Sequence, residues 1–372
     1  MDLYLFLSCS LCLIFTATFL HLLGRSKTSD RAPAGKLPPG PTRVPIIGNL
    51  HNLGPNPHKS LADLAKVHGP LMSLKLGRVT TIVASSPAMA KEILQKHDKV
   101  LSNRHVNLAM EALDHHKFSL PLLPVESKYW RNLRKVCNSY IFTAQRLDSN
   151  EELRRVKVAE LVEGVRRNAS GEAIDAGTDT TSTTLEWAMA ELLRNPNALA
   201  KAREELDATI GKGNNFQESD VSRLPYLQAI LKETFRLHPA APLLLPRKGG
   251  EDVEICGFIM PKGVQILVNV WAIGRDPMIW DDPNAFVPER FLGSEVSAKG
   301  NNFELLPFGA GRRICPGLPL ALRILHMMLG SLIHWFDWKL PDGVEPEKLD
   351  MDEKFGMALQ KAKPLLAIPT PR

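Results

Sequence analysis

The longest apolar stretch of the chain lies at its N-terminus. From Leu3 to Leu23 there is no Lys, Arg, Asp or Glu, and a helix of that length spans about 31 Å, which matches the hydrocarbon core of a bilayer. Asp2 precedes the stretch and Arg25 and Lys27 follow it, the reverse of the charge order in a cleaved signal peptide, which is the alternative interpretation. The pattern predicts an uncleaved membrane anchor, residues 1–24, whose basic flank keeps the rest of the chain in the cytosol.

The next segment, residues 25–48, is basic and rich in proline. It contains Leu37-Pro-Pro-Gly-Pro41 and Pro45. Because proline fixes φ and keeps the preceding residue out of helical geometry, the segment is expected to be stiff and extended. We interpret it as a hinge that holds the globular body, residues 49–372, at a set angle to the bilayer.

The hydrophobic periodicity of that body predicts a mainly α-helical fold with small β-sheets. Two runs, Leu71–Leu76 and Val79–Ala84, are typical of strands joined by a tight turn at Gly77-Arg78. Asn195 followed by Pro196 predicts the N-cap and first residue of a helix. Helices are predicted for residues 196–210, 224–238 and from Pro316 onward, and a further strand for residues 264–270.

The composition excludes several classes of protein. The chain has 372 residues, of which 44% are hydrophobic and 23% charged, as in ordinary globular proteins. A formal net charge of +6 is too small to predict nucleic acid as a partner. Five cysteines, an odd number, argue against a disulfide-stapled secreted domain. There is no phosphate-binding loop motif, and Gly309-Ala-Gly311 lacks the third glycine of a dinucleotide-binding fingerprint.

The candidate chemistry centres on Cys315, which stands just before the long C-terminal helix. Gly309 and Gly311 allow the preceding loop backbone conformations that other residues avoid. Backbone N–H groups, the helix dipole and the neighbouring Arg312 and Arg313 are expected to favour the thiolate over the thiol. A thiolate held in this way suits an axial iron ligand. A buried free cysteine and a cysteine nucleophile are the alternatives.

The residues around this cysteine form a longer motif. Phe308, Gly311, Arg313, Cys315 and Gly317 match F-x-x-G-x-R-x-C-x-G, which resembles the haem-binding signature of the cytochrome P-450 family. The resemblance implies a cytochrome P-450 fold that binds haem b (iron protoporphyrin IX). It also implies that Cys315 ligates the iron, with Phe308, Gly309 and Gly311 packed beside it.

A second motif of that family is present in the family's order. Lys232-Glu-Thr-Phe-Arg236 places Glu233 and Arg236 three residues apart, on one face of a helix. Such a pair is usually a solvated surface ion pair. The resemblance instead implies a buried network in which both join Arg290 of Pro288-Glu-Arg-Phe291.

Four further residues resemble the groups that hold the haem propionates in the family. Trp130 and Arg134 have W-x-x-x-R spacing, and Arg247 and Arg313 are similar to the remaining partners. Each would otherwise be interpreted as a surface residue. A buried carboxylate needs a cation with directed donors, which arginine provides.

The stretch Ala176-Gly-Thr-Asp-Thr-Thr181 is similar to the family's oxygen-activation motif. By this resemblance Gly177 leaves room for dioxygen. Asp179 and Thr180 resemble the acid–alcohol pair that supplies protons during oxygen activation. The alternative is an ordinary Thr-rich helix start with a capping Asp.

Within the family, three stretches resemble plant microsomal, geraniol-hydroxylase-like terpenoid oxidases. They are Leu101-Ser-Asn-Arg104, Phe118-Ser-Leu-Pro121 and Trp130–Cys137. This resemblance implies a monooxygenase of the endoplasmic reticulum membrane that hydroxylates a small lipophilic substrate, a terpenoid. It would use O2 and electrons from NADPH, delivered by an NADPH-cytochrome reductase or a cytochrome b-type donor.

One departure from the family's pattern is large. Only 49 residues separate Trp130 from Asp179, and the chain is about 120 to 130 residues shorter than family members of typical length. We place the missing interval near residues 175/176, where the family has the helices that roof the substrate pocket. Two hypotheses follow: a working monooxygenase, or a non-catalytic truncated member with impaired haem binding.

Overall fold

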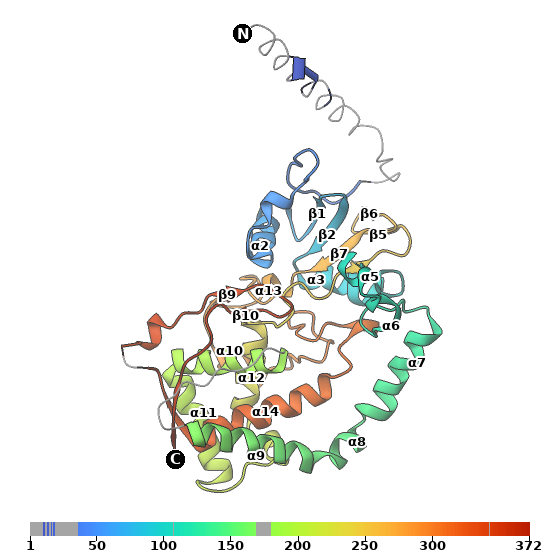
Figure 1. Cartoon of the computed structure of the whole chain (residues 1–372). Coiled ribbons are helices and arrows are strands. Elements are labelled where there is room, and N and C mark those ends of the chain that lie inside the picture. Colours follow the sequence, from blue (N-terminus) through green and yellow to red (C-terminus); the bar gives the residue numbers. More distant parts are fainter. Residues whose placement is uncertain are drawn as a thin grey trace.

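The computed structural model describes residues 36–106, 108–168, 180–341 and 343–372, together with Ser10, Leu11, Leu13, Ile14, Thr16 and Thr18. The described residues of the N-terminal segment are helical, and Leu11, Leu13 and Ile14 are exposed. The rest of the predicted anchor lies outside the described residues. In the body, the part that contains the main sheet lies at one end, and the long helices pack together at the other (Figure 1).

The main sheet has the strand order β1–β2–β7–β4–β3. Its strands are β1 (Leu71–Leu76), β2 (Val79–Ala84), β7 (Gln265–Val268), β4 (Arg247–Lys248) and β3 (Asn103–Arg104). β2 and β7 are parallel, and the other pairs are antiparallel. The predicted hairpin is confirmed, and Gly77 adopts a φ of 58° in its turn. The predicted strand at 264–270 is shorter than expected, because Val270 already begins a helix.

Three two-stranded sheets complete the β-structure of the described residues. They pair β5 (Val253–Ile255) with β6 (Phe258–Met260), β9 (Glu353–Lys354) with β10 (Gln360–Lys361), and β8 (Phe336–Lys339) with β11 (Ile368–Pro371). All three pairs are antiparallel.

The remaining regular structure is helical. The α-helices are α2 (Pro57–His68), α3 (Pro87–Lys91), α4 (Asp98–Leu101), α5 (Leu108–Ala112), α6 (His115–Phe118), α7 (Lys128–Val136), α8 (Ala144–Ser149), α9 (Glu151–Asn168), α10 (Thr180–Arg194), α11 (Pro196–Ile210), α12 (Pro225–Leu237), α13 (Val270–Ile273) and α14 (Leu318–Trp335). Short 3-10 or π segments are η1 (Leu50–Asn52), η2 (Glu92–Lys96), η3 (Cys137–Ile141), η4 (Glu218–Arg223), η5 (Pro288–Phe291), η6 (Gly311–Arg313) and η7 (Pro346–Lys348).

The three predicted long helices are confirmed as α11, α12 and α14. Gly211 ends α11 with a φ of 83°, a conformation that glycine adopts at little cost. Asn195 is the N-cap residue and Pro196 the first residue of α11, as predicted, although the Asn195 side chain makes no cap hydrogen bond. Its amide instead donates to the carbonyl oxygen of Glu191, at 2.8 Å, in the preceding helix.

The largest hydrophobic core lies between α9, α10, α11, α12 and α14. Leu192 of α10 and Leu329 and Ile333 of α14 are fully buried there. Among the described residues, α14 is the helix that is long and apolar enough to cross a membrane, and half of it is buried inside the protein. Its apolar character is therefore explained by its place in the core.

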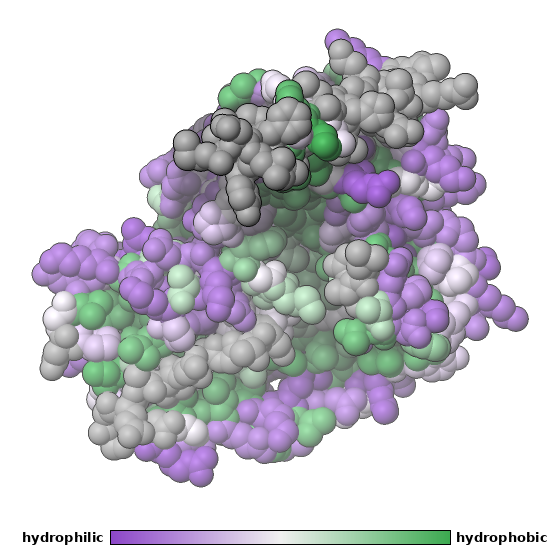
Figure 2. All heavy atoms as spheres, turned by 45° about the horizontal axis from the view of Figure 1, so that its top comes forward, coloured by the Kyte–Doolittle hydropathy of each residue, from purple (hydrophilic) through white to green (hydrophobic). Residues whose placement is uncertain are grey.

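Apolar surface is also left facing water. On one face the molecule is hollowed, with hydrophobic atoms on the floor of the hollow and hydrophilic atoms around it (Figure 2). Elsewhere Leu153 and Val156 of α9 and Tyr140 and Ile141 of η3 are exposed. These side chains present apolar surface of the two segments to solvent.

The close approach of α14 to the loop before η4 gives a test of this core. A Cβ at Gly330 would lie 2.3 Å from Cε1 of Phe216, so Gly330→Ala should lower the free energy of unfolding by about 1–3 kcal/mol through overpacking. In Gly164→Ala of α9 the new Cβ would meet no atom within 4 Å, and the same quantity should rise by about 0.5–1 kcal/mol. Urea unfolding followed by circular dichroism measures both; equal effects would contradict the packing described.

Candidate functional site

The loop that precedes α14 holds Cys315 in a defined position. The N–H of Cys315 donates to the carbonyl oxygen of Phe308 at 3.0 Å, which closes the loop on itself. Gly309 and Gly311 have φ values of 66° and 69°, the left-handed region that favours glycine. A Cβ at Gly311 would lie 2.1 Å from the carbonyl oxygen of Leu94. The structure therefore explains why glycine stands at both positions. Each has a left-handed backbone conformation, and at Gly311 a Cβ would also clash with Leu94.

The electrostatics of Cys315 differ from the prediction. Cys315 is exposed and not in a disulfide. Partial removal of its sulfur from water raises the pKa of the thiol, and this effect outweighs the opposing effects of the Gly317 and Leu318 N–H groups and of the Arg134 charge. The expectation that the protein atoms alone favour the thiolate is therefore wrong. A bound metal cation changes this balance, because a coordinating thiol loses its proton.

The predicted charges beside the sulfur also lie elsewhere. The guanidinium of Arg312 lies 3.9 Å from Asp98. The guanidinium of Arg313 donates to the carbonyl oxygens of Ser102, at 2.8 Å, and Leu120, at 3.1 Å. The cation that acts on Cys315 is instead Arg134 of α7. It donates to the carbonyl oxygen of Ile314, at 2.7 Å.

Two of the predicted propionate partners come from one helix. Ser127 caps α7 through the N–H of Trp130, at 3.0 Å. Trp130 is 7% exposed, and Arg134 lies about one turn further along the same face. The guanidinium carbon of Arg313 lies 5.1 Å from the centre of the Trp130 ring, a cation–π distance. The structure therefore brings Trp130, Arg134 and Arg313 together around the Cys315 loop.

Arg247 completes the predicted set from the sheet. It is 3% exposed and donates to Asp98 at 2.9 Å and to the carbonyl oxygen of Ala310 at 3.1 Å. Burial lowers its pKa, although Asp98 opposes that effect. Its bond to Ala310 ties the sheet directly to the Cys315 loop.

A fourth arginine, which the sequence did not assign to the site, lies in the same region. Arg104 of β3 is directly opposite Arg247 of β4 in the strand register. Burial first, then repulsion by Arg247 and Arg313, lowers the pKa of Arg104 to about 9. Among the described residues, its guanidinium donates to the main-chain oxygens of Pro121 and Leu245. The sole sequence signal was the resemblance of Leu101-Ser-Asn-Arg104 to family members.

Positive charge is in excess in this region. We call its four arginines, Arg104, Arg134, Arg247 and Arg313, the arginine cluster. Burial first, and then repulsion by Arg247, lowers the pKa of Arg313 to about 10. Like charges directly opposite in a sheet are destabilising, and Asp98 is the carboxylate within hydrogen-bond distance of Arg247. Such a cluster favours anions, and arginine suits carboxylates in particular.

The helix that carries the predicted oxygen-activation motif begins at Thr180. Gly177 and Asp179 lie outside the described residues. Thr180 is exposed, and its carbonyl oxygen accepts a hydrogen bond from Thr184 at 2.8 Å. The motif's alcohol thus belongs to the first described residue of α10. Its pairing with Asp179 stays a prediction.

The predicted Glu–Arg–Arg network is present and buried. Glu233 and Arg236 are fully buried, with hydrogen bonds of 2.6 and 2.7 Å between them. Arg290 donates to Glu233 at 3.0 Å. Arg236 also donates to the carbonyl oxygens of Gly274 and Pro283. The alternative of a solvated surface pair is therefore wrong.

Comparison with known proteins places the chain in a family. A family model described as cytochrome P-450 matches residues 38–175 and 167–367. The chain is 42% identical to the geraniol 8-hydroxylase of Catharanthus roseus, with 98% of this chain and 99% of that protein covered. It is 41% identical to the geraniol 8-hydroxylase of Swertia mussotii (98% and 99%) and 41% identical to cytochrome P-450 76AD1 of Beta vulgaris (95% and 96%). The chain belongs to the cytochrome P-450 family.

Members of this family are monooxygenases that use haem, O2 and electrons from a redox partner. A haem group fits the residues described. The two carboxylates of its propionates meet the charge excess of the arginine cluster, and the exposed sulfur of Cys315 is free to bind iron. Phe308 packs edge-on against Phe235 of α12, with 5.4 Å between ring centres, which fixes the loop beside the sulfur.

The alignments also measure how much shorter this chain is than its relatives. The match to the Catharanthus roseus protein runs over 498 aligned positions, whereas the chain has 372 residues, so at least 126 positions have no residue here. This agrees with the predicted shortfall. The two parts of the family match overlap at residues 167–175, and the join near 175/176 stays a prediction.

The buried network gives a stability test. In Glu233→Gln the side chain keeps its shape but leaves Arg236 and Arg290 without a carboxylate, and the free energy of unfolding should fall by about 3–5 kcal/mol. The matched control is Glu163→Gln in α9, where an exposed pair with Arg166 at 3.1 Å is lost and the change should stay below about 1 kcal/mol. Urea unfolding measures both, and a loss at Glu233 no larger than that at Glu163 would contradict a stabilising network.

Proposed function

We propose that this chain is a haem-thiolate monooxygenase that hydroxylates a small lipophilic terpenoid. The observation that carries the proposal is the convergence of Cys315, Trp130 and the arginine cluster on one loop. The names of two relatives, both geraniol 8-hydroxylases, support a terpenoid substrate. The electrons come from NADPH through an NADPH-cytochrome reductase or a cytochrome b-type donor.

The residues of the site would divide the work as follows. Cys315 Sγ would hold the iron, and Arg104, Arg134, Arg247 and Arg313, with Trp130, would hold the propionates. When bound, haem supplies the activation of dioxygen. The hydroxyl oxygen of Thr180 would pass a proton supplied by Asp179, and Gly177 would leave space for the oxygen molecule.

We further propose that the protein resides in the endoplasmic reticulum membrane, as a single-pass protein with its body in the cytosol. The apolar stretch Leu3–Leu23 and the basic residues that follow it support this location. The exposed side chains of Leu11, Leu13 and Ile14 are compatible with contact to lipid.

Haem binding through the sulfur is tested by spectroscopy. Reduced, membrane-expressed protein should give a carbon monoxide difference spectrum with the Soret band of a thiolate ligand. Cys315→Ala should abolish that band, whereas Cys256→Ser, at an exposed cysteine outside the site, should retain it. Absence of the band from the wild-type protein would contradict the proposal and favour the non-catalytic hypothesis.

Oxygen activation is tested separately from haem binding. Thr180→Ala removes the hydroxyl that would move the proton, so it should spare the Soret band while product formed per NADPH consumed falls on the order of a hundredfold. Thr370→Ala, at an exposed position of β11, should change neither quantity. Unaltered coupling in Thr180→Ala would show that this hydroxyl has no part in proton supply.

A further inference from the structure

Asp98, the first residue of α4, is a buried carboxylate that neither binds the iron nor moves a proton in the proposed reaction. Only 7% of it is exposed. Removing a carboxylate from water is costly unless hydrogen bonds and opposite charge compensate for the loss of hydration. The groups that donate to Asp98 therefore indicate what this residue contributes.

The two oxygens of this carboxylate bind different parts of the site. Oδ1 accepts from the guanidinium of Arg247, at 2.9 Å, and from the hydroxyl of Ser102, at 2.6 Å. Oδ2 accepts from the backbone N–H of Arg312, at 2.9 Å. Arg312 stands three residues before Cys315. One carboxylate thus connects an arginine that would hold a propionate with the loop that carries the sulfur.

The loop is packed tightly around this connection. A Cβ at Gly311 would lie 2.8 Å from Oδ1 of Asp98 and 2.1 Å from the carbonyl oxygen of Leu94, so the loop backbone lies directly against α4 and the segment before it. Arg247 also donates to the carbonyl oxygen of Ala310, at 3.1 Å. Asp98, Arg247 and the loop backbone therefore form a closed set of hydrogen bonds, in which each member holds the other two.

The bond from the Arg312 N–H separates this arrangement from an ordinary buried ion pair. A pair that only neutralised Arg247 would need no contact with the loop. A hydrogen bond from a main-chain N–H to a carboxylate is charge-assisted and about twice as strong as a neutral one. It fixes the backbone of the loop rather than a side chain, within η6, just before the chain reaches Cys315.

We propose that Asp98 is a positioning residue that sets the place of the Cys315 sulfur relative to Arg247, so that both meet one haem group. The inference rests on the proposed haem-thiolate function, although the connection itself involves only residues of this chain. Because the haem macrocycle is rigid, a shift of the sulfur relative to Arg247 weakens either the iron bond or the propionate contact.

The first test uses the full chain in detergent, without haem. In Asp98→Asn one carboxylate oxygen becomes an amide nitrogen, a donor that faces either Arg247 or the Arg312 N–H, so one of the two bonds is lost. Hydrogen–deuterium exchange read by mass spectrometry should show amides of residues 308–315 exchanging at least tenfold faster. The matched control is Glu353→Gln, which removes a carboxylate that is 8% exposed and pairs with Lys59 at 2.7 Å. It should leave exchange in this segment within twofold.

The second test adds haem to the same proteins and follows the Soret absorbance. Asp98→Asn should raise the dissociation constant for haem at least tenfold and lower the share of the carbon monoxide difference band at the thiolate position, whereas Glu353→Gln should change neither by more than twofold. Asp98→Glu keeps the charge and moves the carboxylate by one methylene. It should still speed exchange in the loop at least threefold and lower the thiolate share, which also decides the matter if Asp98→Asn does not fold.

Two results would overturn the proposal. Loop exchange and haem affinity that match wild type in Asp98→Asn would show that the connection does not hold the loop. Wild-type behaviour of Asp98→Glu in both tests would assign the role to charge rather than to position. A wild-type chain that binds no haem would refute the proposed function instead, and the exchange measurement would still decide whether Asp98 holds the loop.

Discussion

The geometry around Cys315 depends on the ion pairs that the buried carboxylate of Glu233 makes. It binds Arg236 and Arg290 in the core, and Arg236 in turn satisfies main-chain oxygens of a long loop that would otherwise be buried without partners. The network thereby holds α12 in place. Phe235 of the same helix packs against Phe308, whose carbonyl oxygen receives the N–H of Cys315. The network is thus connected to the Cys315 loop through α12 and Phe308.

The arginine cluster shows a different principle. Arg104 and Arg247 face one another across two strands, and burial and mutual repulsion lower the pKa of Arg104 to about 9. An arrangement of this kind costs folding free energy in the chain alone. A ligand with two carboxylates removes the repulsion, and any ligand that binds only the folded state stabilises that state. A ligand with two carboxylates that bound at this cluster would therefore also stabilise the folded chain.

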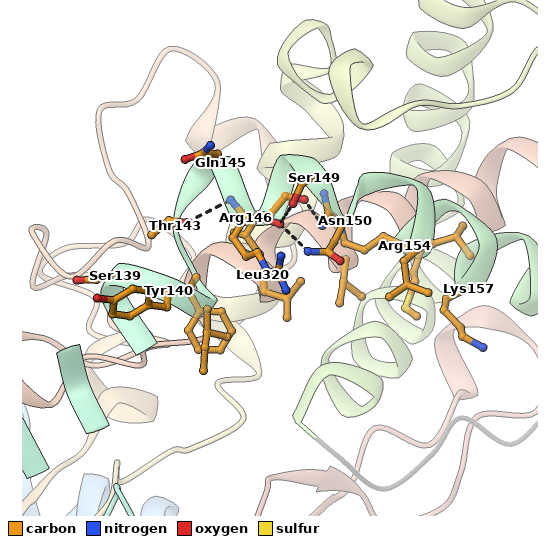
Figure 3. Close-up of a pocket in the computed structure, with 17 residues that line it drawn as sticks. Ser139, Tyr140, Thr143, Gln145, Arg146, Ser149, Asn150, Arg154, Lys157 and Leu320 are labelled. Carbon is orange, nitrogen blue, oxygen red and sulfur yellow. Dashed lines mark hydrogen bonds between the residues drawn. The ribbon is translucent and has the colours of Figure 1, made fainter. Parts of the chain in front are cut away.

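The absent interval affects one region of the protein more than the rest. The network behind the Cys315 loop and the contacts of Arg134, Arg247 and Arg313 are all complete within the described residues. By contrast, Thr180, the first described residue of α10, is exposed, and α9 and α14 line an open groove (Figure 3). The contacts around the Cys315 loop are therefore made, while Thr180 and the groove, which lie near the predicted position of the missing interval, are open to solvent. Binding and catalysis can be affected separately for this reason.

The sequence by itself determined the features that depend on neighbouring residues. These are the hairpin at Gly77, the helices α11, α12 and α14, the glycine positions of the Cys315 loop and the pairing of Glu233 with Arg236. They could be predicted because hydrophobic periodicity, turn chemistry and helical spacing act between residues close together in the chain. Only the tertiary structure decided that Arg104 opposes Arg247, that Arg134 rather than Arg312 or Arg313 acts on the sulfur, and that the thiol pKa is raised. Those outcomes depend on strand pairing and desolvation between segments far apart in the chain, which no local pattern encodes.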